Sequence, residues 1–223
     1  MSFVAIINYG SGNVTSVYNA ILRILSNKTI CKRIVVTNKP SDINKSSHVI
    51  LPGVGSFKGC LDGFYSKPGL FNSMSENVLV KNKPFLGICV GMQMLADRGF
   101  EDGENDGFGW IKGEVKPISV KNSTYKIPHI GWNNLELEND HSFIEFLKYK
   151  KKFPKKEVNA YFVHSYSFKT KEPNTKLITT RYSNEIIAMV GKRNILGTQF
   201  HPEKSQRFGL DFLETFLSWE FVK

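Results

Sequence analysis

Apolar residues recur along the first half of the chain with two alternating spacings. The runs 3–8, 34–37, 48–51 and 84–88 are short and mostly apolar, a pattern typical of buried strands. Between the first two runs, apolar side chains stand three and four residues apart on one helical face, at Val14, Val17, Tyr18, Ile21 and Leu25. Further helices are expected over about 68–81 and directly after residue 89. Strands that alternate with helices predict a parallel sheet with right-handed crossovers, covered on both faces.

The second half of the chain is richer in strands. Strand-like segments follow one another at short intervals over 113–120, 124–137, 160–169, 177–182, 186–191 and 195–200. Helical spacing is confined to 143–148 and 207–221, and short turns between strands favour antiparallel pairing. The sequence therefore predicts an α/β fold, a three-layer open and mostly parallel sheet that is flanked by helices and extended by antiparallel strands in its C-terminal half. Residues 1–223 are expected to form a single domain.

The composition is that of an ordinary globular protein and bears on whether the chain enters a membrane, is secreted or forms disulfides. Hydrophobic residues make up 41% and charged residues 22% of the chain, so a packed core is expected. No apolar run approaches the roughly 20 residues that span a bilayer, and the first residues lack the basic region of a signal peptide. The three cysteines, Cys31, Cys60 and Cys89, are widely spaced. They fit reduced thiols in the cytoplasm and predict neither disulfides nor a metal site.

The net charge of +10 raises the question of an acidic partner. Much of the excess is lysine within 148–157, and basic patches attract nucleic-acid backbones. No zinc-finger spacing, arginine-rich stripe or RNA-binding aromatic motif accompanies these lysines. A solvated lysine loop is the preferred interpretation, so neither nucleic acid nor a membrane is expected as a partner. The acidic segment 101–106 is likewise interpreted as surface.

The segment "PFLGICVGMQML", residues 84–95, places a cysteine between glycines after a buried strand. Gly-x-Cys-x-Gly between a strand and a helix is the cysteine version of the nucleophile elbow. Gly87 and Gly91 remove side chains that would clash with a strained turn at Cys89. Such a turn aims the sulfur at the helix N-terminus, where unpaired N–H groups and the helix dipole favour the thiolate. The alternative for the motif taken alone is a buried structural cysteine.

A thiolate nucleophile needs a base, and His201 is the best placed of the five histidines. Pro202 restricts His201 to extended geometry, in which residues two apart point the same way. Glu203 can therefore share a face with His201 and orient its imidazole. Cys89, His201 and Glu203 would then be the nucleophile, base and orienting group of a generalised triad. A strand-ending turn is the alternative for the tripeptide taken alone.

Backbone donors for an oxyanion are expected from two places. One is the N–H of Val90, directly after the cysteine in the turn. The other is the end of a strand at Gly53-Val54-Gly55, where a glycine-rich loop can present N–H groups to an anion. This loop lacks the full pattern of a dinucleotide or nucleoside-triphosphate site, so it does not support a nucleotide. A simple tight turn is the alternative.

Together these motifs resemble the class I glutamine amidotransferases, and more narrowly the glutaminase subunits of imidazole glycerol phosphate synthase. They extend along nearly the whole chain: "NYGSGN" (8–13), "LPGVGSF" (51–57), "PFLGICVGMQML" (84–95), "PHIGWN" (128–133), "YFVHSY" (161–166) and "TQFHPEKS" (198–205). The elbow and His-Pro-Glu are shared by the class. Pro-Gly-Val-Gly, Gly-Trp-Asn and Phe-Val-His-Ser-Tyr select the narrower family.

The resemblance implies a reaction and a role for individual residues. Cys89 would attack the carboxamide carbon of glutamine and form a γ-glutamyl thioester. His201, held by Glu203, would protonate the departing ammonia and then activate water to release glutamate. Gln93 and the backbone around Ser165 and Tyr166 correspond to positions that hold glutamine. No cofactor and no metal are expected to take part.

The resemblance also implies a partner. In the family, ammonia passes through a channel to a (β/α)8 cyclase subunit, which forms imidazole glycerol phosphate and an aminoimidazole carboxamide ribotide in histidine biosynthesis. Asn13, Trp132 and Lys204 match positions that face this partner in the heterodimer. Their alternatives are structural: a helix N-cap for Asn13, core packing for Trp132 and a surface charge for Lys204.

Two other functions stay open at the level of sequence. Close relatives of such subunits supply ammonia for the amidination of cell-surface sugars. One subunit barely separates the two pathways, because the partner binds the acceptor. A non-enzymatic binding protein that retains the fold is the second alternative, and the intact set of Cys89, His201 and Glu203 argues against it.

Overall fold

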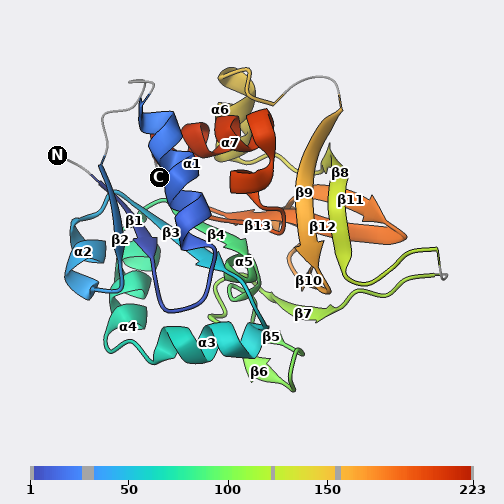
Figure 1. Cartoon of the computed structure of the whole chain (residues 1–223), viewed down its shortest axis with the longest axis horizontal. Coiled ribbons are helices and arrows are strands. Elements are labelled where there is room, and N and C mark those ends of the chain that lie inside the picture. The colour runs from blue at the N-terminus through green and yellow to red at the C-terminus, as the bar shows by residue number, and fades with distance from the viewer. Residues whose placement is uncertain (1–2, 27–32, 122–123, 154–156, 222–223) are drawn as a thin grey trace.

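The computed structural model describes residues 3–26, 33–121, 124–153 and 157–221, and a nine-stranded sheet runs through its centre (Figure 1). The strand order is β2-β1-β3-β4-β13-β12-β11-β8-β9. The first five strands pair in parallel: β2 (Arg33–Thr37), β1 (Phe3–Ile7), β3 (His48–Gly53), β4 (Phe85–Cys89) and β13 (Ile195–Thr198). The others continue with antiparallel pairing: β12 (Asn184–Lys192), β11 (Lys176–Tyr182), β8 (His129–Leu137) and β9 (Val158–His164). The predicted α/β fold with an antiparallel extension is confirmed.

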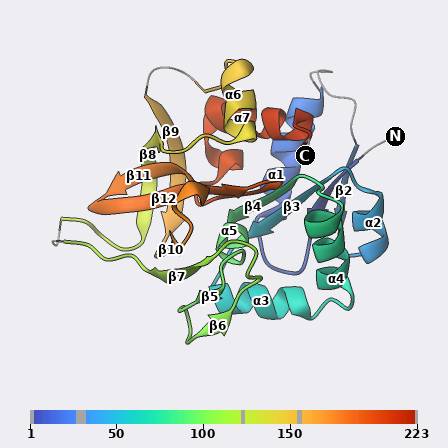
Figure 2. The ribbon, with the colours of Figure 1, turned by 180° about the vertical axis from the view of Figure 1, so that it is seen from behind.

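Helices cover both faces of this sheet, as Figures 1 and 2 show from opposite sides. One face carries α1 (Val14–Ser26), α6 (Ser142–Tyr149) and α7 (Gln206–Ser218), and α7 contacts the other two. The opposite face carries α2 (Pro40–Lys45), α3 (Phe57–Tyr65), α4 (Leu70–Ser75) with its π-helical continuation η1 (Glu76–Val80), and the single turn α5 (Val90–Gln93). Among the described residues there are also two 3-10 turns, η2 (Pro173–Thr175) and η3 (Pro202–Lys204).

Burial follows from this layering. Every residue of β3 and β4 is buried, as expected for parallel strands between two helical layers. Helix α1 packs its apolar face on the sheet and confirms the helix predicted there. Val17 and Ile21 of the predicted face are buried, whereas Val14, Tyr18 and Leu25 are only partly so.

The apolar pattern failed to predict two helices, α2 and α3. Helix α2 has six residues and buries only Ile43, so it is too short to show a helical period. Helix α3 does bury residues at helical spacing, and the Ser56 side chain caps it by accepting from the Gly59 N–H at 3.2 Å. Gly59 and Gly63 lower the helix propensity of this segment, but the serine cap and the apolar spacing were available as signals.

The strand predicted over 160–169 is wrong as a single element, because β9 and β10 (Tyr166–Thr170) belong to different sheets. The chain changes sheet at Ser165, whose carbonyl accepts from the Ile118 N–H at 2.8 Å. The alternation of apolar and polar residues in the sequence continues across this point, although the alternation of buried positions does not, so the sequence pattern could not reveal the change of sheet. The strand predicted over 124–137 begins only at His129, and the helix predicted after residue 89 is one turn long.

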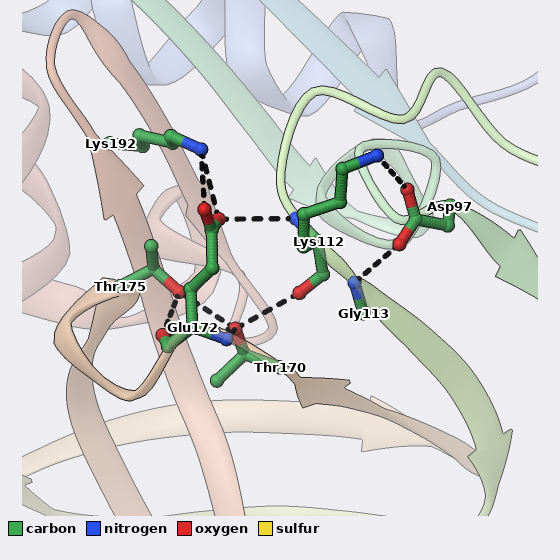
Figure 3. Close-up of polar contacts among 7 residues, drawn as sticks. All are labelled: Asp97, Lys112, Gly113, Thr170, Glu172, Thr175 and Lys192. Carbon is green, nitrogen blue, oxygen red and sulfur yellow. Dashed lines mark hydrogen bonds and ion pairs between the residues drawn. The ribbon is translucent and has the colours of Figure 1, made fainter.

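The second sheet has the order β10-β7-β5-β6 and adds β7 (Gly113–Pro117), β5 (Arg98–Gly99) and β6 (Asn105–Asp106). Figure 3 shows the polar cluster that ties it to the larger sheet. Glu172 accepts from Lys192 Nζ at 2.8 and 3.0 Å and from the backbone N–H of Lys112 at 3.3 Å. The Thr170 hydroxyl donates to the Lys112 carbonyl at 3.1 Å. Since Lys192 ends β12 and Lys112 precedes β7, one carboxylate joins the two sheets.

Candidate active site

A cavity of about 300 Å³ lies beside the carboxyl ends of β3 and β4, and the start of β10 forms part of its wall. Its lining comprises Val54, Gly55, Cys89, Val90, Gln93, Glu101, Pro128, Val163, His164, Ser165, Tyr166, His201 and Lys204. Carboxyl ends of parallel strands are the usual ligand sites of open α/β sheets. Most of the residues predicted from the motifs are therefore brought together here from distant parts of the chain.

Cys89 sits at the end of β4 in a backbone conformation that L residues rarely adopt. Its φ is 54° and its ψ is −111°, and such positions cost about 1–3 kcal/mol unless the surroundings enforce them. A Cβ atom on Gly91 would lie 2.0 Å from the Leu51 carbonyl oxygen, and one on Gly87 would lie 2.4 Å from the Gly91 carbonyl oxygen. The two glycines thus allow the turn to approach β3. Helix α5 has only four residues, so its dipole is weaker than the sequence argument assumed.

His201 follows β13 and is held at both its ring and its backbone. Its Nδ1 atom lies 2.8 Å from Oε1 of Glu203, whose side chain is fully buried. The His201 N–H donates to the Tyr161 carbonyl at 2.9 Å, and the Ser205 hydroxyl donates to the His201 carbonyl at 2.7 Å. The predicted contact between His201 and Glu203 is present, but the 3-10 turn Pro202–Lys204 makes it, and not the extended chain that the sequence predicted.

The electrostatics of His201 favour its charged form. Burial disfavours the imidazolium, but the Cys89 sulfur and the Glu203 carboxylate outweigh this effect and raise the pKa of His201 to about 10. Its Nε2 atom is buried and makes no hydrogen bond with any described residue. The arrangement suits a thiolate paired with an imidazolium.

The glycine-rich loop after β3 contributes part of the cavity wall. Val54 and Gly55 line the cavity, whereas Gly53 does not. Gly53 ends β3 opposite Cys89, and a Cβ atom there would lie 2.5 Å from the backbone nitrogen of Gly91. Gly53 therefore serves the close packing of the turn, and Val54, Gly55 and Val90 are the oxyanion candidates that face the cavity.

The residues predicted to hold glutamine line the cavity from two elements. Gln93 Nε2 donates to the Tyr166 carbonyl at 3.1 Å and to Gln199 Oε1 at 3.0 Å. Both hydrogens of this amide are used within the protein, so its carbonyl oxygen is the atom left for a ligand. Ser165 and Tyr166 form the turn between the two sheets, with the Ser165 carbonyl bonded to Ile118 as described above.

Sequence reasoning missed Glu101, the one acidic side chain among the described residues that line the cavity. Its Oε2 atom accepts from the Phe57 N–H, at the start of α3, at 2.7 Å. Burial raises the pKa of Glu101. The surface interpretation of 101–106 is therefore wrong for this residue, because β5 and β6 fold the segment back over the start of α3. An acidic run carries no local signal of such a contact.

The three residues predicted to face a partner occupy different environments. Asn13 Nδ2 donates to Glu203 Oε1 at 3.5 Å. Lys204 lines the cavity, and its Nζ atom lies 5.9 Å from the ring centre of Tyr161. Trp132 stands on β8, packs edge-on against Tyr161 and is 47% exposed, so core packing does not account for it.

A metal site and a membrane-spanning helix are considered over the described ranges of the chain, 3–26, 33–121, 124–153 and 157–221. In those ranges no group of three or more His, Cys, Asp or Glu side chains could hold a metal ion. None of the helices that the structure describes is long and apolar enough to cross a membrane.

Known proteins with related sequences show the family of this chain. Residues 5–218 match the model of the class-I glutamine amidotransferase family. The chain is 43% identical over 219 residues to "Imidazole glycerol phosphate synthase subunit HisH" of Zymomonas mobilis, with 98% of this chain and 96% of the relative covered. It is 42% identical to the subunit of the same name from Rhodospirillum rubrum, with 97% and 98% covered.

Solved structures show the same fold. A glutamine amidotransferase of Thermotoga maritima matches with a TM-score of 0.58 at 21% identity, covering 91% of this chain and 76% of the other. A second glutamine amidotransferase matches with a TM-score of 0.67 at 17% identity, covering 96% and 99%. The chain therefore belongs to the class-I glutamine amidotransferase family and, within it, to the HisH subunits of imidazole glycerol phosphate synthase.

Proposed function

We propose that this chain hydrolyses glutamine to glutamate and ammonia, with Cys89 as nucleophile, His201 as acid and base, and Glu203 as the group that orients His201. One observation carries the proposal. A strained cysteine opens onto a cavity beside a buried histidine that a buried carboxylate holds in place. This is the arrangement that acyl transfer through a thioester requires.

The first half of the reaction forms the thioester. The Cys89 thiolate bonds to the γ-carboxamide carbon of glutamine, and the carbonyl electron pair moves to the oxygen. The N–H of Val90 and an N–H of the Val54–Gly55 segment stabilise this oxyanion. The His201 imidazolium gives its proton to the amide nitrogen as the C–N bond breaks. Ammonia leaves, and Cys89 carries the γ-glutamyl group.

The second half releases glutamate. Neutral His201 takes a proton from water, whose oxygen bonds to the thioester carbon. The tetrahedral intermediate collapses and expels the Cys89 thiolate, which restores the starting ion pair. Glu203 keeps Nδ1 of His201 protonated throughout, so that Nε2 is the nitrogen that exchanges protons.

Glu101 gives the cavity a counter-charge for the substrate. The α-ammonium of glutamine is its one cationic group, and a carboxylate in a confined cavity pairs with it well. We expect Glu101→Gln to raise KM for glutamine about tenfold and to change kcat little, since the ammonium is remote from the reacting carbon. Steady-state kinetics over a range of glutamine concentrations checks this. Glu104→Gln, an equal change at an exposed position of the same segment, should leave KM unchanged.

Ammonia would pass from this cavity to a (β/α)8 cyclase subunit in a heterodimer, in the histidine pathway. The name of the relatives, subunits of imidazole glycerol phosphate synthase, supports this acceptor. The exposed Trp132 and the cavity residue Lys204 support a docking face next to the site. The cyclase reaction itself would belong to the partner, so this chain supplies only the hydrolytic half.

Glutamate release by the purified chain tests the proposal, measured alone and with an imidazole glycerol phosphate cyclase subunit plus its nucleotide ligand. We expect strong stimulation by the cyclase, and a loss of roughly 10³-fold or more in Cys89→Ala. Cys60→Ala, which removes the other buried thiol that the structure describes, should keep most of the activity. Full activity in Cys89→Ala would overturn the triad. A rate that needs Cys89 but ignores the cyclase would point to another acceptor, with sugar amidination first.

A further inference from the structure

The Cys89 sulfur has a hydrogen-bond donor that the proposed triad does not include. Nε2 of Gln199 lies 3.6 Å from Cys89 Sγ, within hydrogen-bond reach of the larger sulfur atom. Gln199 is completely buried and lies two residues before His201. Because α5 is a single turn, this amide is a more direct source of thiolate support than the helix dipole.

The orientation of the Gln199 amide is set by its neighbour. Gln93 Nε2 donates both to the Tyr166 carbonyl at 3.1 Å and to Gln199 Oε1 at 3.0 Å. A backbone carbonyl can only accept, so the nitrogen of Gln93 must face it. The second N–H of Gln93 then occupies the oxygen of Gln199. The nitrogen of Gln199 is thereby directed to the sulfur.

The Tyr166 carbonyl is in turn held by a pair of buried histidines. His164 Nδ1 lies 2.8 Å from this carbonyl and so carries a proton. Its Nε2 lies 2.9 Å from His129 Nδ1, which must therefore be the donor. His129 Nε2 is left to accept from Asn133 Nδ2 at 3.3 Å. Each N–H of this series therefore meets an acceptor, and the second N–H of Asn133 donates to the Arg181 carbonyl at 3.0 Å.

The histidine pair stays neutral, as this series requires. Burial lowers the pKa of His129 to about 4 and that of His164 to about 3. Protonation of His164 would place its Nε2–H opposite the Nδ1–H of His129 across 2.9 Å, and protonation of His129 would place an Nε2–H opposite the Asn133 amide nitrogen across 3.3 Å. Each hydrogen bond of the series therefore has one direction at neutral pH. Asn133, His129 and His164 donate toward the Tyr166 carbonyl, which also accepts from Gln93. Gln93 donates in addition to Gln199, whose own amide donates to the cysteine.

We propose that Gln199 donates its amide N–H to the Cys89 sulfur and favours the thiolate, and that Gln93, His164 and His129 are positioning residues that fix the direction of this amide. The inference rests on the proposed function only in taking Cys89 as the nucleophile. It gives Gln93 a second role: besides the expected contact with glutamine, Gln93 orients the amide that donates to the Cys89 sulfur. A thiolate accepts such hydrogen bonds more strongly than a thiol, because charged acceptors form the stronger bonds.

The test is the rate at which iodoacetamide alkylates Cys89 in the intact chain, followed by mass spectrometry of the peptide that contains it. The thiolate is the reacting form, so the rate at pH 7 reports its fraction and needs no glutamine. Gln199→Met keeps the size of the side chain and removes the N–H, and we expect about tenfold slower alkylation. Gln199→Glu replaces the donor by a carboxylate and should be slower still. Gln206→Met, at an exposed glutamine, should react at the wild-type rate.

Gln93→Met removes the bond to Gln199 Oε1 without touching the sulfur. It frees the Gln199 amide to turn, and we expect an effect of about threefold, between wild type and Gln199→Met. Circular dichroism and alkylation in guanidinium, where all variants should react alike, separate this effect from unfolding. Folded Gln199 variants that react at the wild-type rate would overturn the inference. Glutamate release that persists in Cys89→Ala would instead overturn the proposed function. The alkylation rate of Cys89 does not depend on that outcome, so the two failures are distinguishable.

Discussion

The two halves of the nine-stranded sheet hold the cavity in different ways. The parallel half is buried throughout β3, β4 and β13, and it supplies Cys89 and His201 from its strand ends. The antiparallel half alternates between buried and accessible positions along β8 and β9, and it supplies the opposite wall through the turn at Tyr166. Close packing of backbone atoms fixes the nucleophile, whereas hydrogen bonds among side chains fix the opposite wall. The backbone packing around Cys89 should therefore be disturbed by an added methyl group. The hydrogen bonds of the opposite wall should be disturbed by a change of charge or pH.

The largest effect is expected from Gly91→Ala in the parallel half. The added methyl group would lie 2.0 Å from the Leu51 carbonyl oxygen, a backbone atom of β3. We expect the free energy of unfolding to fall by about 3 kcal/mol, with no measurable glutamate release. Urea denaturation and the glutaminase assay check both. Gly103→Ala is the control: its φ is +95° with open space around it, so it should cost about 1–2 kcal/mol through backbone strain and leave activity intact. Equal losses of activity in the two variants would contradict the packing argument.

Acid should weaken the antiparallel half through its buried histidines. The pKa values of His129 (about 4) and His164 (about 3) lie below the unfolded value of about 6.5. The unfolded chain thus binds more protons over this range. Stability is complete above pH 6.5 and falls as the pH drops toward 4, by up to about 1.4 kcal/mol per pH unit and histidine.

Urea midpoints at pH 7, 6 and 5 measure this slope. His129→Asn keeps a donor near Nδ1 but cannot titrate, so its slope should be smaller. An unchanged slope would contradict the assignment to the pair. His201 has a raised pKa of about 10, so its stabilising effect is complete below pH 6.5 and is lost only as the pH rises toward 10. It adds no slope in the acid range.

A smaller effect is expected where the two sheets are joined. Glu172→Gln removes the charge that binds Lys192 and the Lys112 N–H (Figure 3), and we expect the free energy of unfolding to fall by about 1 kcal/mol. Loss of this anchor should loosen the smaller sheet, which contains β10. Because β10 begins at Tyr166, a residue expected to hold glutamine, KM for glutamine should rise more than kcat falls. Glu185→Gln breaks a more exposed ion pair with Lys176 and should change neither constant. Equal effects of the two variants would show that Glu172 acts only through surface charge.

The smallest effect on the chain itself is expected from Trp132→Ala. This side chain is 47% exposed on β8, so its truncation should cost less than about 1 kcal/mol of unfolding free energy. Affinity for the cyclase subunit should nevertheless fall at least tenfold, measured by calorimetric titration. Tyr149→Ala, at a side chain that is 78% exposed on α6, should alter neither quantity. Unchanged affinity in Trp132→Ala would remove this tryptophan from the docking face.

The sequence by itself determined the features that depend on near neighbours. Alternating strands and helices predicted the parallel half, since side-chain spacing records which face of an element is buried. Gly-x-Cys-x-Gly predicted the turn at Cys89, and His-Pro-Glu predicted the pairing of His201 with Glu203. Each of these relations spans only a few residues, so backbone geometry alone constrains it.

Only the tertiary structure decided which distant residues meet at the cavity. Glu101 looked like part of an acidic surface run, yet β5 and β6 bring it to the cavity wall. Gln199 stood within a quoted motif, but its contact with Cys89 depends on Gln93, which in turn is held by the turn at Tyr166. Such contacts join elements that are far apart in the chain, and neither periodicity nor local propensity carries information about them. They follow from the order of strands in the two sheets, which is settled when the whole core packs.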